Sequence, residues 1–268
     1  MVLKMGYKLA KRILMLGWLL STGFSAAQTR YFESFDNVKI AYDIEGVGAP
    51  IILLHGFINS RKSWDQTPLK KDLLTEGYQV ITIDLRGNGD SDKPQNDKAY
   101  QNDAEVKDII ALLEELAIEN CSAVGYSRGS IVLAKLLTKD KRITKAVLGG
   151  MGIDFTDAQW NRRLLFAAAF DGQISKETKG AVTYAKSIGA DLRSLHLQQR
   201  YQPVTSKKEL ARVAAEVLVL AGDKDLDNGD PKDLQGAIPN ATLRLVAGDH
   251  NGTYKTRDFS KVILRFLK

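Results

Sequence analysis

The segment Cys121-Ser122-Ala123-Val124-Gly125-Tyr126-Ser127-Arg128-Gly129 is an apolar run that leads directly into a serine flanked by glycines. The run before Gly125 is typical of a strand buried in a parallel sheet, and the pattern from Arg128 to Thr138 is helical. Gly-x-Ser-x-Gly between such elements predicts a tight, strained turn that holds the serine hydroxyl above the sheet edge. The free N–H groups of the helix N-terminus then face Ser127. Ser127 is therefore a candidate nucleophile.

Working outward, strand-like and helical patterns alternate along most of the chain. Such alternation predicts a mostly parallel sheet covered on both faces by helices. It is interrupted between residues 150 and 212, where the patterns are helical. We expect a core of residues 28–149 and 213–268, with residues 150–212 forming an inserted cap over one end of the sheet. The apolar residues of the first cap helix are expected to pack as core, the alternative being an acyl pocket: Trp160, Leu164, Leu165, Phe166 and Phe170.

The charge of the chain is concentrated at its N-terminal end. The 268 residues carry a formal net charge of +6, with 38 Lys and Arg against 32 Asp and Glu. Residues 1–27 hold Lys4, Lys8, Lys11 and Arg12 and no acid, so the remaining part has 34 bases against 32 acids. This near balance predicts no charged partner, and the scattered cations lack the basic stripe of a nucleic-acid-binding protein.

The basic stretch of residues 4–12, the apolar run Ile13–Leu20 and the small residues Ser25-Ala26-Ala27 form the three parts of a secretory signal peptide. We expect residues 1–27 to be cleaved and the protein to be exported, either periplasmic or secreted, in a bacterium. The alternative is an uncleaved anchor, but the apolar run is shorter than the roughly 20 residues that span a bilayer. Cys121 is the only cysteine and is interpreted as a small buried hydrophobe, so no intrachain disulfide forms.

A nucleophilic serine needs a base, and the base needs an orienting acid. The chain has three histidines. His250 follows the strand-like run ending at Val246, whereas His196 lies within a helical pattern. Asp223, Asp225 and Asp227 follow another strand-like run and are all available as the acid. The order Ser127, Asp225, His250 matches the serine–acid–histidine order of this geometry.

The sequence His55-Gly56-Phe57 ends an apolar strand pattern at residues 51–54. Gly56 allows a turn in which the amide of Phe57 faces a substrate oxygen, and the amide of Arg128 would complete a two-donor oxyanion hole. His55 is expected to brace the loop rather than to act as a base. The Arg128 side chain could meet an anion, but we expect it to point into solvent.

Across essentially the whole of residues 28–268 the chain resembles the α/β-hydrolase superfamily, of the serine-nucleophile type with a helical cap. The matching motifs are His55-Gly56-Phe57, residues 84–91 (DLRGNGDS), the turn at Ser127, Gly222-Asp223-Lys224-Asp225, and His250. The resemblance implies an eight-stranded, mostly parallel sheet with the cap inserted after the sixth strand. It also implies that the second aspartate of Gly-Asp-x-Asp, Asp225, is the acid, with Asp223 as runner-up, and that residues 84–91 are structural.

Capped relatives such as epoxide hydrolases carry an aspartate at the elbow, so Ser127 favours acyl transfer. We expect hydrolysis of a small or medium carboxylic ester without a metal or organic cofactor. Carbon–carbon bond hydrolysis, lactone opening and perhydrolysis would use the same three residues. A catalytically idle hydrolase-fold binding protein is the alternative of another class, and the complete set of Ser127, Asp225 and His250 is an argument against it. The expected partner is a small acyl substrate, with no nucleic acid and no stable membrane anchor after cleavage.

Overall fold

The computed structural model describes residues 28–225 and 227–268, so the predicted signal peptide lies outside the described residues. Eight strands form one sheet in the order β1-β2-β4-β3-β5-β6-β7-β8. β1 pairs antiparallel with β2 and β2 with β4, and all other neighbours are parallel. The strands are β1 Arg30–Glu33, β2 Lys39–Glu45, β3 Pro50–Leu54, β4 Gln79–Ile83, β5 Cys121–Tyr126, β6 Ile143–Gly149, β7 Glu216–Gly222 and β8 Ala241–Val246.

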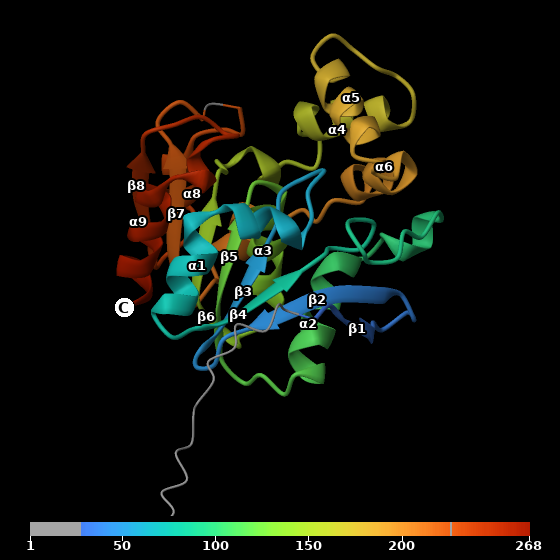
Figure 1. The fold of residues 1–268 in the computed structure, drawn as a ribbon. Helices are drawn as coiled ribbons and strands as arrows, with labels where there is room; N and C mark the ends of the chain where they lie inside the picture. The colour runs from blue at the N-terminus through green and yellow to red at the C-terminus, as the bar shows by residue number, and fades with distance from the viewer. Residues whose placement is uncertain (1–27, 226) are drawn as a thin grey trace, which may run out of the picture.

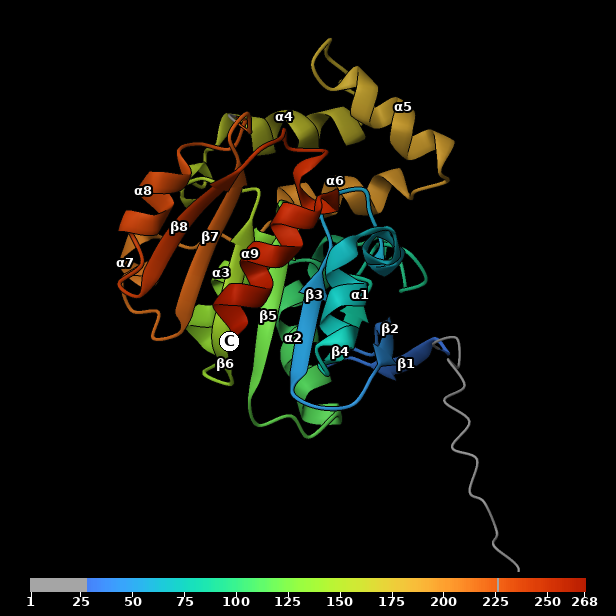
Figure 2. The ribbon, with the colours of Figure 1, turned by 60° about the vertical axis from the view of Figure 1, so that its left-hand side comes forward.

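Helices cover both faces of the sheet (Figures 1 and 2). The core helices are α1 Pro68–Thr75, α2 Ala104–Glu115, α3 Arg128–Lys139, α8 Pro231–Gly236 and α9 Arg257–Leu267. Alternate residues of β3 pack on opposite sides, as the pleat of a strand requires. Ile51 and Leu53 contact the cluster that includes α1 and α9, whereas Ile52 and Leu54 belong to the cluster of α2, α3 and α8. The central strands are therefore buried on both faces, which explains their continuous apolar sequences.

The segment between β6 and β7 is helical and lies above the carboxyl ends of the parallel strands (Figure 1). It contains α4 Asn161–Phe170, α5 Lys179–Ser187, α6 Leu192–Arg200 and the short α7 Lys207–Leu210. We call residues 150–212 the cap. The part of the core expected from residue 213 starts with a turn, and β7 begins only at Glu216, because the Val213 amide donates to the Leu210 carbonyl and continues the turn that ends α7. In the described part of the chain no helix has the length and apolarity to cross a membrane.

The loop of residues 84–91 is built around the buried carboxylate of Asp84. This carboxylate accepts hydrogen bonds from the amides of Arg61, at 2.6 Å, and Asp90, at 2.8 Å, and is ion-paired with the Arg61 guanidinium. Ser91 Oγ donates to the Asp84 carbonyl and accepts from the amide of Ala41 in β2. These contacts fix the end of β4 to its neighbours.

Candidate active site

Ser127 occupies the turn between β5 and α3, and its backbone is strained. Its φ is 53° and its ψ is −120°, a combination that non-glycine residues seldom adopt. Such a conformation costs about 1–3 kcal/mol and persists only where the surroundings impose it. Here the Ser127 amide donates to the carbonyl of Gly149, and its carbonyl accepts from Ser130, each at 2.8 Å. The turn is therefore held from both sides, with the serine side chain at the base of a cavity.

Two glycines allow the strand and the helix to meet at this turn. A Cβ at Gly125 would lie 2.5 Å from the carbonyl carbon of Gly129, and a Cβ at Gly129 would lie 2.3 Å from the carbonyl oxygen of Leu54. Both distances are far inside van der Waals contact with backbone atoms. The close approach of α3 to β5 and β3 therefore requires glycine at both positions.

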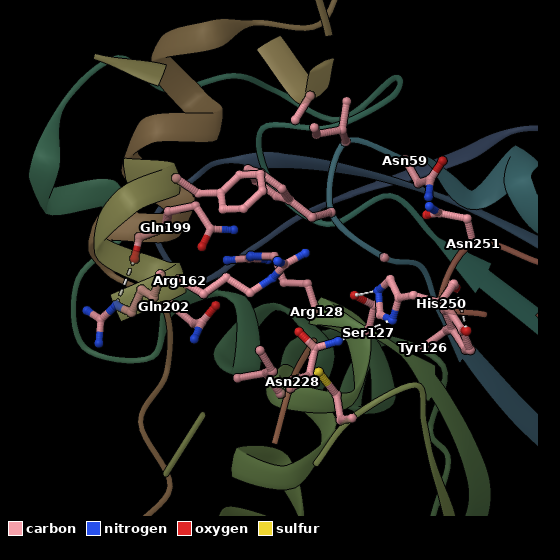
Figure 3. Close-up of a pocket in the computed structure, with 18 of the residues that line it drawn as sticks. Asn59, Tyr126, Ser127, Arg128, Arg162, Gln199, Gln202, Asn228, His250 and Asn251 are labelled. Atoms are coloured by element: carbon pink, nitrogen blue, oxygen red, sulfur yellow. Dashed lines mark hydrogen bonds between the residues drawn. The ribbon is translucent and has the colours of Figure 1, made fainter. Parts of the chain in front are cut away.

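Ser127, His250 and Asp225 lie within hydrogen-bonding distance of one another, in that order (Figure 3 shows Ser127 and His250). His250 Nε2 is 2.9 Å from Ser127 Oγ, and His250 Nδ1 is 2.8 Å from Asp225 Oδ2. A carboxylate only accepts hydrogen bonds, so Nδ1 carries the proton and Nε2 is free to accept from the serine hydroxyl. The Asp225 side chain is 2% exposed, which strengthens its interaction with the imidazole.

The neighbouring aspartates have other partners. Asp223 Oδ1 accepts a hydrogen bond from the Gly248 amide at 3.0 Å and so joins the ends of β7 and β8. The Asp227 side chain is 63% exposed, with a carboxylate oxygen 4.0 Å from the guanidinium of Arg162. Of the three aspartates considered from the sequence, Asp225 is the one that the structure places against His250.

Two residues that the sequence did not single out lie against His250. The Tyr126 hydroxyl donates to the His250 carbonyl at 2.7 Å, and its ring lies 5.6 Å from the imidazole. Burial raises the pKa of Tyr126, which keeps this hydroxyl protonated as a donor. Asn228 Nδ2 lies 3.2 Å from His250 Nδ1, but both nitrogens are donors when Nδ1 donates to Asp225, so the acceptor for Asn228 is the Gly150 carbonyl at 3.3 Å. Tyr126 thus ties the loop after β8 to the elbow, and Asn228 ties the loop after β7 to the residues that follow β6.

The amides of Phe57 and Arg128 border the same cavity, which Gly56 and Ser127 also line. Within the described part of the chain, neither amide donates to another protein group, so both can donate to a ligand oxygen. The Phe57 side chain is engaged elsewhere. Its ring packs edge-on against Phe166 and Phe170 of α4, with ring centroids 6.0 and 5.4 Å away.

The expectation that the Arg128 side chain points into solvent is wrong. The residue is 2% exposed, and its guanidinium makes two hydrogen bonds of 2.5 Å to the carboxylate oxygens of Glu105 in α2. It also donates to the Gln198 carbonyl of α6 at 3.0 Å. A charge next to the strained turn is buried only because a paired carboxylate compensates it.

His55 and His196 do not contact the candidate triad. His55 Nε2 accepts from the amide of Leu85 at 3.1 Å, so Nδ1 carries the proton and donates to the Gly56 carbonyl at 2.8 Å. Burial lowers the pKa of His55, which keeps it neutral and able to brace the turn that presents Phe57. His196 is buried in the cap, where Nδ1 lies 2.8 Å from the Ala167 carbonyl.

The cavity above Ser127 has a volume of about 560 Å³ and lies between the core and the cap. The expectation that the apolar residues of this segment pack as core is confirmed only in part. Phe170 is buried, whereas Trp160 and Phe166 pack against buried clusters on one side and line the cavity on the other, and Leu164 is 44% exposed. The stripe is therefore divided between packing and the cavity wall. Among residues 28–225 and 227–268, no group of three or more His, Cys, Asp or Glu side chains is arranged to hold a metal ion.

Comparison with known proteins identifies the family. A family model described as "alpha/beta hydrolase fold" matches residues 49–182. The chain belongs to the α/β-hydrolase family. A similar protein from Synechocystis sp., named putative non-heme chloroperoxidase, is 37% identical over 118 residues, or 43% of this chain and 41% of the relative. The 2-hydroxymuconate semialdehyde hydrolase of a Pseudomonas species is 31% identical over 158 residues, 53% of this chain and 56% of the relative. The matches thus span about half the length of these relatives.

Solved structures of α/β hydrolases extend the likeness to nearly the whole chain. A hydrolase from Pseudomonas aeruginosa superposes with a TM-score of 0.75 at 21% identity, over 91% of this chain and 99% of its own. An esterase from Exiguobacterium antarcticum gives 0.71 at 18% identity, over 90% and 99%. At this level of identity the likeness establishes the fold alone.

Proposed function

We propose that this α/β hydrolase cleaves a small or medium carboxylic ester through an acyl-enzyme intermediate. The observation that carries the proposal is the chain of contacts from Ser127 Oγ through His250 to Asp225. A serine hydroxyl is a weak nucleophile until an adjacent base accepts its proton, and the base is effective when a third group fixes its tautomer. His250 is the adjacent base for Ser127, and Asp225 is the group that fixes its tautomer.

In the proposed reaction, Ser127 Oγ attacks the ester carbonyl carbon while His250 Nε2 takes the hydroxyl proton. The carbonyl oxygen becomes an anion that accepts hydrogen bonds from the amides of Phe57 and Arg128. Collapse of this intermediate breaks the carbon–oxygen bond, and the leaving alcohol takes the proton from His250. Water then attacks the acyl-enzyme by the same proton route, releasing the acid and restoring Ser127.

Asp225 stays ionised throughout and stabilises the imidazolium that forms at each attack. Its burial, with a side chain only 2% exposed, makes this electrostatic contribution larger than it would be in water. The strain at Ser127 keeps its hydroxyl aligned with Nε2 before substrate arrives, so no further ordering is needed at the moment of attack.

The test combines labelling with turnover. We expect a fluorophosphonate probe to label wild-type protein at Ser127, and a series of nitrophenyl esters from acetate to octanoate to be hydrolysed. Ser127→Ala should abolish both the label and the turnover while retaining the thermal midpoint. Thr205→Ala, at a buried hydroxyl in the cap, is the control that should keep the label. Absence of labelling and of ester turnover in wild-type protein would overturn the proposal and favour a non-catalytic binding protein.

Ester, thioester, lactone and carbon–carbon substrates should be compared side by side, because relatives with different reaction names share this fold. A carbon–carbon hydrolase or a perhydrolase would use the same three residues and would be distinguished by its preferred substrate. The proposed partner is a small acyl compound. The basic and apolar sequence of residues 1–20 supports export of the protein as a second proposal. A fusion of residues 1–30 to a reporter that is active only outside the cytoplasm tests it, and an inactive fusion would contradict it.

A further inference from the structure

The charge of the cavity walls has one sign. Among the described residues that line the cavity above Ser127, four are cationic and none is an aspartate or a glutamate: Arg128, Arg162, Arg163 and Lys255. The whole chain has nearly balanced charges outside residues 1–27. An unbalanced cavity in an almost balanced protein points to a ligand with the opposite charge, because a concave, low-dielectric wall concentrates the field of its charges.

The four cations are not equivalent. Arg128 is neutralised by the two-point contact with Glu105. Arg163 donates to the carbonyls of Gln199, at 2.9 Å, and Arg200, at 2.6 Å, which are neutral partners. Burial, and to a smaller extent the nearby Arg128 charge, lower the pKa of Arg163. Arg162 has one carboxylate oxygen 4.0 Å away, on the exposed Asp227. Of the three arginines, Arg162 is the one whose guanidinium makes no hydrogen bond with another described residue, so its N–H groups are open to a ligand.

The position of Arg162 suits it to hold a ligand. It lies on α4, on the cap side of the cavity across from Ser127 and His250 (Figure 3). Its guanidinium carbon is 5.0 Å from the centre of the Phe166 ring, and this contact restricts the directions in which the guanidinium N–H groups can point. The side chain is 37% exposed, so it has been only partly removed from water and can still exchange water for a ligand.

The same cavity offers a second donor. Gln202, in the segment that follows α6, is 4% exposed, and its Nε2 has no hydrogen-bond partner in the structure. A buried amide nitrogen without a partner is unfavourable, so an acceptor is expected at this point. Gln202 lines the same cavity as Arg162, and Figure 3 shows both on the side away from Ser127 and His250. The guanidinium and the amide together offer several N–H groups and no negatively charged acceptor.

We propose that the substrate carries a carboxylate on the part of the molecule remote from the ester, and that Arg162 and Gln202 bind it. This inference rests on the proposed ester hydrolysis at Ser127 and names its substrate class as monoesters of dicarboxylic acids. An arginine fork matches the two oxygens of a carboxylate, and the amide supplies one more donor. The apolar walls at Trp160 and Phe166 would enclose the chain between the two carboxyl groups.

The kinetic experiment compares two esters that differ only in charge. These are 4-nitrophenyl hydrogen adipate, which has a free carboxylate, and the same compound with that carboxylate methylated. We expect wild-type kcat/KM to be higher for the anionic ester. Arg162→Gln should lower the anionic-to-neutral ratio of kcat/KM at least tenfold, mainly through KM, and Arg162→Lys should give an intermediate ratio. Gln202→Leu should lower the ratio by about threefold to tenfold.

The matched control is Arg200→Gln, which removes the same charge from an exposed position of α6 that does not line the cavity. Its ratio should stay within twofold of wild type. An unchanged ratio in Arg162→Gln, or an equal fall in Arg200→Gln, would overturn the proposal. The thermal midpoints of all variants show whether a fall in the anionic-to-neutral ratio of kcat/KM is caused by unfolding of the variant.

Binding to the Ser127→Ala variant separates this inference from the proposed function. Calorimetry should show that monomethyl adipate binds at least tenfold more tightly than dimethyl adipate, and that adding Arg162→Gln removes the difference. If wild type is neither labelled nor active but this binding difference holds, the proposed hydrolysis fails and the carboxylate site stands. If wild type hydrolyses neutral esters and the binding difference is absent, the carboxylate site fails and the hydrolysis stands.

Discussion

The guanidinium of Arg128 and the carboxylate of Glu105 form a buried ion pair with two hydrogen bonds of 2.5 Å, directly behind the turn that carries Ser127. Both side chains are at most 4% exposed. The pair joins the start of α3 to the first turn of α2. The backbone amide of Arg128 is also one of the two proposed oxyanion donors. Because the ion pair fixes the Arg128 side chain, it also helps to fix the position of this amide.

Glu105→Gln should therefore affect both stability and turnover. It leaves a buried cation facing a neutral amide, and the loss of one partner of a buried pair costs about 3–5 kcal/mol. We expect this fall in the free energy of unfolding by urea, together with a lower kcat toward nitrophenyl esters. Glu114→Gln, at a 68% exposed position of the same helix, is the control and should change stability by less than about 0.5 kcal/mol. Equal stability of the two variants would show that the pair does not anchor the turn.

Replacing the two aspartates of the Gly-Asp-x-Asp motif should have unequal effects on turnover. Asp225→Asn should lower kcat by roughly 10⁴-fold, because an amide at this position no longer fixes the His250 tautomer or stabilises the imidazolium. Asp223→Asn keeps an oxygen that can accept from the Gly248 amide and should lose less than about tenfold. The measurement is kcat for a neutral nitrophenyl ester. A larger loss in Asp223→Asn would assign the acid role to the other residue.

Gly129→Ala should disrupt the elbow. The added Cβ would lie 2.3 Å from the Leu54 carbonyl oxygen, so α3 must move away from β3. Forcing such overlap costs about 1–3 kcal/mol or more and should displace Ser127 from His250. Gly236→Ala, at a helical position of α8 where a Cβ meets nothing within 4 Å, should instead stabilise by about 0.5–1 kcal/mol. Urea unfolding and fluorophosphonate labelling of both variants check the contrast, and normal labelling of Gly129→Ala would refute it.

The segment that leads from the cap back to the core contains α7, and its contribution to stability should depend on pH through Glu209. Lys135 and the backbone and hydroxyl of Ser206 bind this carboxylate and lower its pKa from 4.5 to about 2. A lowered pKa in the folded state means that Glu209 adds stability in full above pH 4.5, and that this contribution is lost as the pH falls towards 2. Wild type should therefore be more stable than Glu209→Gln at neutral pH.

The difference in stability between wild type and Glu209→Gln should decrease as the pH falls from 4.5 to about 2. The measurement is the urea midpoint of wild type and of Glu209→Gln from about pH 7 down to about pH 2. Glu216→Gln, at an exposed position, corrects for the effect of removing a carboxylate that has no such contacts. A stability difference that stays constant with pH would show that the charge of Glu209 does not contribute to the stability of the folded protein.

The sequence predicted most of the fold because its signals are local. Apolar runs such as residues 51–54 and 121–124 are buried on both faces of the sheet, and the glycines beside Ser127 are required by backbone contacts within the same turn. Ser127, Asp225 and His250 follow the carboxyl ends of β5, β7 and β8, which meet at one edge of the parallel sheet. The sequence could therefore place these residues near each other before any coordinates were known.

Other features depend on partners that are distant in the chain. Arg128 is buried because Glu105 lies on the adjoining helix, and no local pattern relates the two. Asp223 and Asp225 share one short motif, and only the fold of that loop decides which faces His250. Nothing in the apolar sequence of α4 distinguishes Phe170, which is buried, from Phe166, which also lines the cavity. Cap helices sit over an open site, so their apolar residues divide between packing and binding.

The ring of Phe57 is held between Phe166 and Phe170 of the cap, while its backbone amide is one of the two proposed oxyanion donors. The side chain of Phe57 therefore contacts α4, while its backbone amide is the proposed donor of a hydrogen bond to the reacting carbonyl. An acyl chain too bulky for the cavity would lift α4 and draw this amide out of line, so the molecule would bind yet react slowly. Chain-length selection in this protein is then expected to act on kcat rather than on affinity, since the loss falls on a contact that matters most in the transition state.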